Sequence, residues 1–119
     1  MLYKKILVWE KSHQLTLEVY KLTKLFPKDE LFGIVSQIRR ASSSVPANIV
    51  EGNSRGSTKE FKRFLFQARG SLTETVYFLE LSKDLNYICE NDFERLYNLA
   101  TEVGKMLNSL ITKLKEKLN

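Results

Sequence analysis

Apolar residues recur at steps of three and four along almost the whole chain, and this spacing places them on one face of an α-helix. The most regular series begins at Phe93 and ends at Leu114, and other series begin at Leu15, Leu31 and Phe61. The alternation typical of strands is absent. Because steps of three and four also form the seam of antiparallel helix packing, the periodicity predicts an all-α protein with four helices.

Turn and capping residues separate the four periodic segments. Pro27 ends the first helix because proline lacks a backbone donor, and Asp29 has the position of an N-cap. Residues 52–56 begin and end with glycine and are typical of a loop, and Ser57 with Glu60 has the spacing of a capping box. We predict helices over residues 10–26, 30–51, 58–86 and 92–117. Their short connections favour an antiparallel up-down-up-down four-helix bundle.

A proline lies inside the second predicted helix. Pro46 removes one backbone hydrogen bond and clashes with the carbonyl of Ser42, so we expect this helix to be kinked near Pro46. The serines at 42–44 have hydroxyls that can return hydrogen bonds to freed carbonyls. Gly70 and Gly104 lie inside other predicted helices, where close contact with a neighbouring helix would explain them.

Chain length and apolar content limit the class of protein. With 119 residues, the chain can form one hydrophobic core but not two, so we expect residues 1–119 to be a single domain. No apolar run approaches the ~18 to 20 residues of a membrane span, and the apolar start of the chain is too short for a signal peptide. A single cysteine, Cys89, fits a reducing compartment. These features predict a cytoplasmic protein without membrane contact.

Basic residues are concentrated in one third of the chain. Residues 31–70 contain seven basic and two acidic residues, so this segment accounts for the whole formal net charge of +5. Such a concentration favours a surface for a polyanion such as RNA, and the alternative is a solvated helix face. The candidate nucleic-acid-binding residues are Arg39, Arg40, Arg55, Lys59, Lys62, Arg63 and Arg69.

Two further sets of residues suggest contacts within or between molecules. Glu51 is flanked by apolar residues and a glycine, which predicts a partly buried carboxylate paired with a cation such as Arg69 on the next helix. Some apolar residues exceed what one bundle core needs to hold, which favours an assembly interface. They are Leu7, Val8, Trp9 and Phe66.

Patterns of enzymes and metal sites are weak. Glu10 and His13 have the spacing of an iron-ligand pair in carboxylate bundles, but such sites need two pairs and two further carboxylates, and His13 is the only histidine. No nucleophile and base combination and no phosphate-binding glycine loop is present. We therefore predict no enzymatic activity, no metal, no cofactor and no small-molecule substrate.

Several motifs resemble those of a known family, in order along the chain from about Trp9 to Leu114. They include Gln37-Ile-Arg-Arg-Ala41, Val45-Pro-Ala-Asn-Ile-Val-Glu-Gly52, Glu60-Phe-Lys-Arg-Phe-Leu65 and Ala68-Arg-Gly-Ser-Leu-Thr-Glu74. The chain resembles the four-helix-bundle family that includes proteins encoded within intervening sequences of bacterial 23S ribosomal RNA. Residues that match its recurring polar positions are Arg39, Arg40, Glu51, Arg55, Arg69 and Glu74. Among these, Glu51, Arg69 and Glu74 are the candidates for a structural polar network.

The resemblance implies an antiparallel bundle that assembles as a ring-like homopentamer and has no known catalytic activity. The family is also similar to the accessory protein of diversity-generating retroelements, a basic pentameric barrel that associates with a reverse transcriptase and nucleic acid. We therefore expect a non-enzymatic, RNA- or ribosome-associated homo-oligomer. The alternative is a structural scaffold or accessory protein that binds a protein partner and contacts no nucleic acid.

Overall fold

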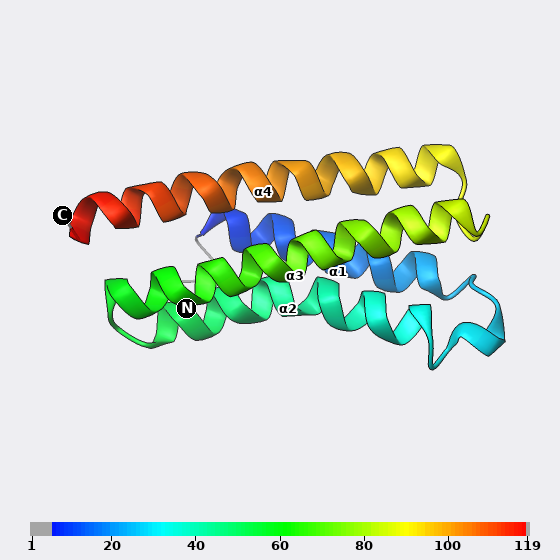
Figure 1. Cartoon of the computed structure of the whole chain (residues 1–119), viewed down its shortest axis with the longest axis horizontal. Coiled ribbons are helices and arrows are strands. Elements are labelled where there is room, and N and C mark those ends of the chain that lie inside the picture. The colour runs from blue at the N-terminus through cyan, green and yellow to red at the C-terminus, as the bar shows by residue number, and fades with distance from the viewer. Residues whose placement is uncertain (1–5, 119) are drawn as a thin grey trace.

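The computed structural model of the chain describes residues 6–118, and nearly all of them are helical. The elements are α1 (Leu7–Thr23), the short 3-10 helix η2 (Lys28–Glu30), α2 (Ile34–Ser54), α3 (Thr58–Asp84) and α4 (Glu90–Leu118). No strand occurs within residues 6–118. The prediction of an all-α fold built from four α-helices is therefore confirmed, and Figure 1 shows the helices side by side in one bundle.

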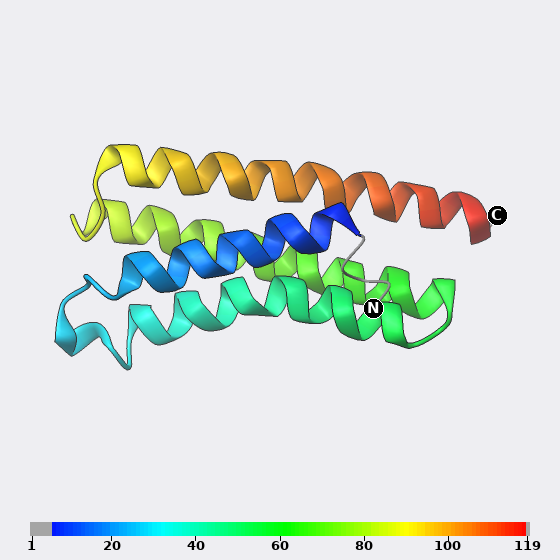
Figure 2. The ribbon, with the colours of Figure 1, turned by 180° about the vertical axis from the view of Figure 1, so that it is seen from behind.

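The bundle is a rod of 48 × 23 × 21 Å in which each helix touches two others. In this part of the chain α1 and α3 each contact α2 and α4, whereas α1 does not contact α3 and α2 does not contact α4. The edge formed by α1 and α2 therefore lies opposite the edge formed by α3 and α4. Figures 1 and 2 show the α1–α2 and α3–α4 connections at one end of the rod, and the α2–α3 connection with the end of α4 at the other.

The core contains the apolar series that the sequence predicts. Residues with almost no exposure to solvent come from all four helices, among them Leu15, Val19, Ile38, Val45, Ile49, Leu65, Leu79, Leu96, Val103 and Leu107. Val8 also belongs to this core, so its assignment to an assembly interface is wrong. Trp9 and Phe66 are partly buried against the core, and Leu7 is exposed.

The start of α2 differs from the prediction. Asp29 lies inside η2 rather than at the N-cap of α2, which is Gly33. Because α2 begins only at Ile34, Leu31 falls in the connection and is 51% exposed instead of lying in the core. The later start also leaves Leu31 and Phe32 together on the surface at this end of the rod. By contrast, half of the predicted capping box of α3 is present, since the backbone N–H of Glu60 donates to the Ser57 hydroxyl oxygen while the Glu60 carboxylate binds Arg63.

The glycines inside helices have different surroundings. Gly52 lies within α2, not in a loop as predicted, and an added Cβ there would lie 2.6 Å from the Cβ of Phe64 on α3. Gly104 has only an ordinary contact, 3.4 Å from a methyl carbon of Leu72. Gly70 faces open space, with no atom within 4 Å of an added Cβ, so the expectation of close helix contact is wrong there. Of these three glycines, Gly52 therefore has the tightest contact with another helix, and that contact lies between α2 and α3.

The carbonyl freed by Pro46 receives a hydrogen bond from another helix. Helix α2 continues through Pro46, which has no N–H to donate to the carbonyl of Ser42. Thr16 of α1 supplies the missing donor, with its hydroxyl 2.9 Å from that carbonyl oxygen, and both residues are buried. The serine hydroxyls bond instead to the carbonyls of Arg39 and Arg40. The kink itself stays a prediction.

The two connections at one end of the rod are joined by a hydrogen bond. The Tyr87 hydroxyl donates to the Glu30 carboxylate at 2.7 Å, and the Tyr87 ring contacts the Phe26 ring with centroids 5.3 Å apart. This hydrogen bond to a carboxylate raises the pKa of Tyr87. The contact fixes η2 across the end of the bundle. None of the helices within residues 6–118 combines the length and apolar character needed to cross a membrane.

Candidate nucleic-acid interface

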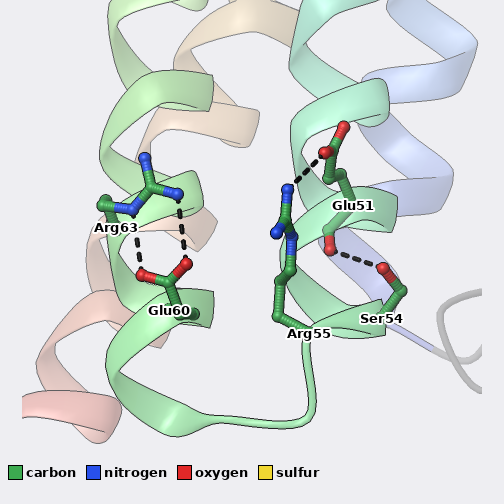
Figure 3. A network of polar contacts seen from close by, with 5 residues as sticks. All are labelled: Glu51, Ser54, Arg55, Glu60 and Arg63. Carbon is green, nitrogen blue, oxygen red and sulfur yellow. Dashed lines mark hydrogen bonds and ion pairs between the residues drawn. The ribbon is translucent and has the colours of Figure 1, made fainter.

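Two carboxylates bind two of the candidate arginines beside the α2–α3 connection (Figure 3). Glu51 pairs with Arg55 at 2.7 Å, one turn along α2, and Glu60 accepts two hydrogen bonds from Arg63 at 3.0 and 3.1 Å on α3. The Arg63 hydrogen bonds hold the pKa of Glu60 below its ordinary value. All four charged groups remain partly in contact with solvent, so each pair is a surface pair.

The prediction that Glu51 forms a buried pair between helices is therefore wrong. Its carboxylate is exposed and pairs within its own helix, because Arg55 is the i+4 neighbour and lies on the same face. Within residues 6–118, the ion pairs that join helices are Lys11–Glu102 and Glu18–Arg95, and both link α1 with α4.

Arg55 and Arg63 also cover an aromatic ring. Their guanidinium carbons lie 5.0 and 4.5 Å from the centroid of the Phe64 ring, which is buried. Each arginine thus has a carboxylate and an aromatic ring as partners. Lys59 and Lys62, on the same turns of α3, have no ion pair with any described residue. These two lysines are the cations that remain available to a phosphate beside this connection.

Arg69 links α3 with α4, and a lysine of α4 that was not among the candidates lies beside it. Its guanidinium donates to the side-chain oxygen of Asn108 at 3.0 Å and lies 4.8 Å from the centroid of the Phe66 ring. Lys115 of α4 lies over the same ring, with its nitrogen 5.6 Å from the centroid. Lys117 lines a cleft of about 360 Å³ together with residues of the α2–α3 connection. The predicted antiparallel packing of the last two helices could have identified both lysines, because it places the end of α4 beside the start of α3.

These residues define the basic end of the rod. It comprises Arg55, Lys59, Lys62, Arg63, Arg69, Lys115 and Lys117, and the carboxylates on the same stretches of chain are Glu51, Glu60 and Glu116. Lys59, Lys115 and Lys117 are exposed, Lys62 is partly buried and Lys115 lies over the Phe66 ring, while the arginines are held by carboxylate, amide or aromatic partners. Such a surface can contact phosphates, but it has no array of side chains arranged to recognise base edges.

Two of the candidate residues lie away from the basic end. Arg39 binds across to α1, where it donates to the Thr23 hydroxyl at 2.9 Å and lies 4.7 Å from the Tyr20 ring centroid. Arg40 is exposed near the middle of α2, and its side chain has no partner among the described residues. The seven candidates therefore do not form one surface, and Arg39 connects helices.

The candidate polar network is not assembled as one unit. Glu51 binds Arg55 and Arg69 binds Asn108. Glu74 is exposed on α3, without an ion pair or side-chain hydrogen bond inside residues 6–118. The described residues also contain no group of three histidine, cysteine or acidic side chains placed to hold a metal, and the ring of His13 stacks on Trp9.

Comparisons with known proteins agree with this architecture. A family model described as 23S rRNA-intervening sequence protein matches residues 4–109. The chain is also similar to the crystal structure of a protein of unknown function from the S23 ribosomal protein family of Bacteroides thetaiotaomicron. That similarity has a TM-score of 0.82 and 32% sequence identity, and it covers 89% of this chain and 96% of the other. Among curated proteins, none matches the chain.

Proposed function

Because the chain belongs to the family of 23S rRNA-intervening sequence proteins, we propose that it is a non-enzymatic RNA-binding protein that acts as a homo-oligomer. The observation that carries the proposal is the basic end, where four lysines of α3 and α4 have no carboxylate partner among the described residues and three of them, Lys59, Lys115 and Lys117, are exposed. Lys59, Lys62, Lys115 and Lys117 supply these charges. A lysine that neutralises a phosphate releases a cation condensed on the RNA backbone, and this release favours binding.

Assembly strengthens this interaction. One copy has a formal charge of +5, so the five copies that the family resemblance implies would carry +25. Several basic ends on one particle contact several phosphates of one RNA at once, and linked contacts raise affinity without any new contact type. Recognition is then by charge and backbone shape, with little dependence on base sequence.

Fluorescence anisotropy with a structured RNA and with duplex DNA tests RNA binding at ~50 and ~200 mM salt. The test variant reverses Lys59 and Lys62 to glutamate, and the matched control reverses Arg40 and Lys105, which are exposed and carry the same charge. We expect the test variant to lose most of its affinity and its salt slope to fall by about two, because each lysine contributes about one phosphate contact. The control should keep most of its affinity.

Equal affinity losses in the two variants would refute the assignment of the basic end. No binding by the unchanged protein at the lower salt would refute RNA binding altogether. Light scattering tests assembly separately, since a mass near 13.9 kDa would identify a monomer.

One observation favours the alternative of a protein-binding scaffold. Leu25 is 82% exposed and Phe32 is 92% exposed at the end of the rod opposite to the basic end. Large apolar side chains this exposed are typical of a surface that another protein covers. If the protein binds no RNA, a scaffold that uses these side chains is the function that remains.

A further inference from the structure

An open cleft lies at the basic end, where α4 extends beyond α1. Helix α4 has 29 residues and α1 has 17, so at about 1.5 Å per residue α4 is longer by about 18 Å. Figures 1 and 2 show α4 continuing past the start of α1 beside the α2–α3 connection. The cleft of about 360 Å³ that Lys117 lines is found there, and we call it the end cleft.

The end cleft has apolar side chains from two helices. Phe61 of α3 and Leu110 and Leu114 of α4 line it. Phe61 is only half-buried, and its ring lies against α2 at Gly52, where an added Cβ would be 3.1 Å from a ring carbon. A phosphate placed on these side chains would lose its hydration without compensation, whereas a flat uncharged ring would bury apolar surface. The apolar part of the end cleft therefore suits a ring.

Polar side chains with unused hydrogen-bonding capacity line the same cleft. They are Asn53 of α2 and Thr58 of α3, and both residues are half-buried. Neither side chain has a hydrogen-bond partner among residues 6–118. The amide of Asn53 offers a donor and an acceptor, which is what the edge of a nucleobase can bind.

The charge around the end cleft is positive. Lys117 lines it, and none of its described lining residues is acidic. Lys59, on the first turn of α3, is exposed and has no ion pair in the described part of the chain. Of the three carboxylates at this end of the rod, Glu51 and Glu60 are each bound by an arginine (Figure 3), and Glu116 stands between two lysines in the sequence. An anionic ligand is therefore attracted to the end cleft.

We propose that the end cleft binds one unpaired base of an RNA, stacked on Phe61, while Lys59 and Lys117 contact the flanking phosphates. A nucleotide joins a flat ring, a polar edge and a phosphate in one unit, and the end cleft has a partner for each. An apolar side chain of a protein would use the apolar part alone. This inference rests on the proposed RNA binding and names the form of RNA that is bound.

That form is single-stranded. In an A-form duplex every base is stacked and paired, so no base can enter the end cleft unless the strands separate. Stacking on an aromatic side chain accepts any base, because every base has a π-face. A preference for unpaired RNA is therefore compatible with little dependence on base sequence.

Fluorescence anisotropy tests this preference with an unstructured RNA strand and an RNA duplex, each about 10 nucleotides long, at ~50 mM salt. The test variant is Phe61→Leu, which keeps an apolar side chain and removes the ring. The matched control is Phe78→Leu, the same change at a half-buried residue of α3 that does not line the end cleft. The test variant should bind the strand about tenfold more weakly and the duplex as before, because it loses one stacking contact. The control should bind both RNAs as before.

Two further measurements do not depend on the packing of Phe61. Asn53→Ala leaves the apolar part of the end cleft intact and should also weaken binding of the strand but not of the duplex. Irradiation of an RNA strand that contains 4-thiouridine locates the base directly, and its crosslinks should fall on residues that line the end cleft. Circular dichroism confirms that each variant is folded.

The outcomes separate this inference from the proposed function. If the unchanged protein binds RNA but Phe61→Leu and Asn53→Ala affect strand and duplex equally, the end cleft is not a base site while RNA binding by the lysines stands. Crosslinks confined to residues outside the end cleft would have the same meaning. If the unchanged protein binds neither RNA, the proposed function and this inference are both overturned.

Discussion

Replacement of Gly52 by alanine tests how closely α2 and α3 approach. Alanine is favoured over glycine inside a helix by about 1 kcal/mol, so the substitution alone should stabilise α2. At this position, however, the new methyl carbon would lie 2.6 Å from the Cβ of Phe64 and 3.1 Å from a ring carbon of Phe61. Carbon atoms in contact need about 3.5–4.0 Å. Because the Cβ of Phe64 moves only with its backbone, α3 must shift as a whole.

The size of the effect follows from a comparison with Gly70. Overpacking of this kind costs typically about 1–3 kcal/mol, so Gly52→Ala should lose between about 0 and 2 kcal/mol in total. Gly70→Ala has the same helix benefit and no atom within 4 Å of the new carbon, so it should gain up to about 1 kcal/mol. The difference between the two variants is the packing cost alone, about 1–3 kcal/mol, which separates their Tm values by at least about 3 °C.

Urea unfolding followed by circular dichroism measures this difference, with every sample at one protein concentration because assembly would shift the midpoint. If Gly52→Ala stabilises the protein as much as Gly70→Ala does, the tight contact between α2 and α3 is refuted.

Two further predictions concern hydrogen bonds and pH. Thr16→Val should cost about 1–3 kcal/mol because it leaves the buried Ser42 carbonyl without a donor, and the cost should shrink in a Pro46→Ala background, where an N–H becomes available; equal costs by urea unfolding in both backgrounds would contradict this. For Glu60, the Arg63 hydrogen bonds lower its folded-state pKa, so its stabilising effect is present above its ordinary value of 4.5 and is lost as the pH falls through the folded-state pKa. The Tm advantage of the unchanged protein over Glu60→Gln should therefore shrink between about pH 6 and pH 3, and a constant advantage would argue against the pairing.

The sequence was sufficient for the existence of the four helices and for most of the core, but not for every helix boundary or for the pairing of charges. Apolar steps of three and four placed Ile38, Val45 and Leu107 correctly, because a buried helix face must be apolar whatever it packs against. The partner of Glu51 was missed because its apolar neighbours suggested burial and a partner on another helix. The i,i+4 spacing of Glu51 and Arg55 was the sequence signal for the observed surface pair.

The basic end needed tertiary information of another kind. Lys115 lies far along the chain from Arg69, and the two meet only because α4 runs back along α3 to the α2–α3 connection. A charge count by sequence segment placed the whole net charge in residues 31–70, although the final turns of α4 also belong to the positive surface. The start of α2 was also missed. Asp29 and Gly33 both suit a helix start, and local sequence does not choose between them. In the structure residues 28–30 form a separate short helix that is bound to Tyr87 at the end of the bundle.

The hydrogen bond between Thr16 and the Ser42 carbonyl sets the register of the first two helices. A regular helix offers no free carbonyl in its interior, so a neighbour can slide along it by one turn, about 5.4 Å, with little penalty beyond repacking. Helix α2 offers one acceptor, at the height that Pro46 specifies, and α1 carries the matching donor. A slide of one turn would take the Thr16 hydroxyl about 5.4 Å away from that carbonyl oxygen. The missing N–H of Pro46 thus favours one position of α1 along α2. That position in turn sets where Leu25 and Phe32 lie at the end of the rod.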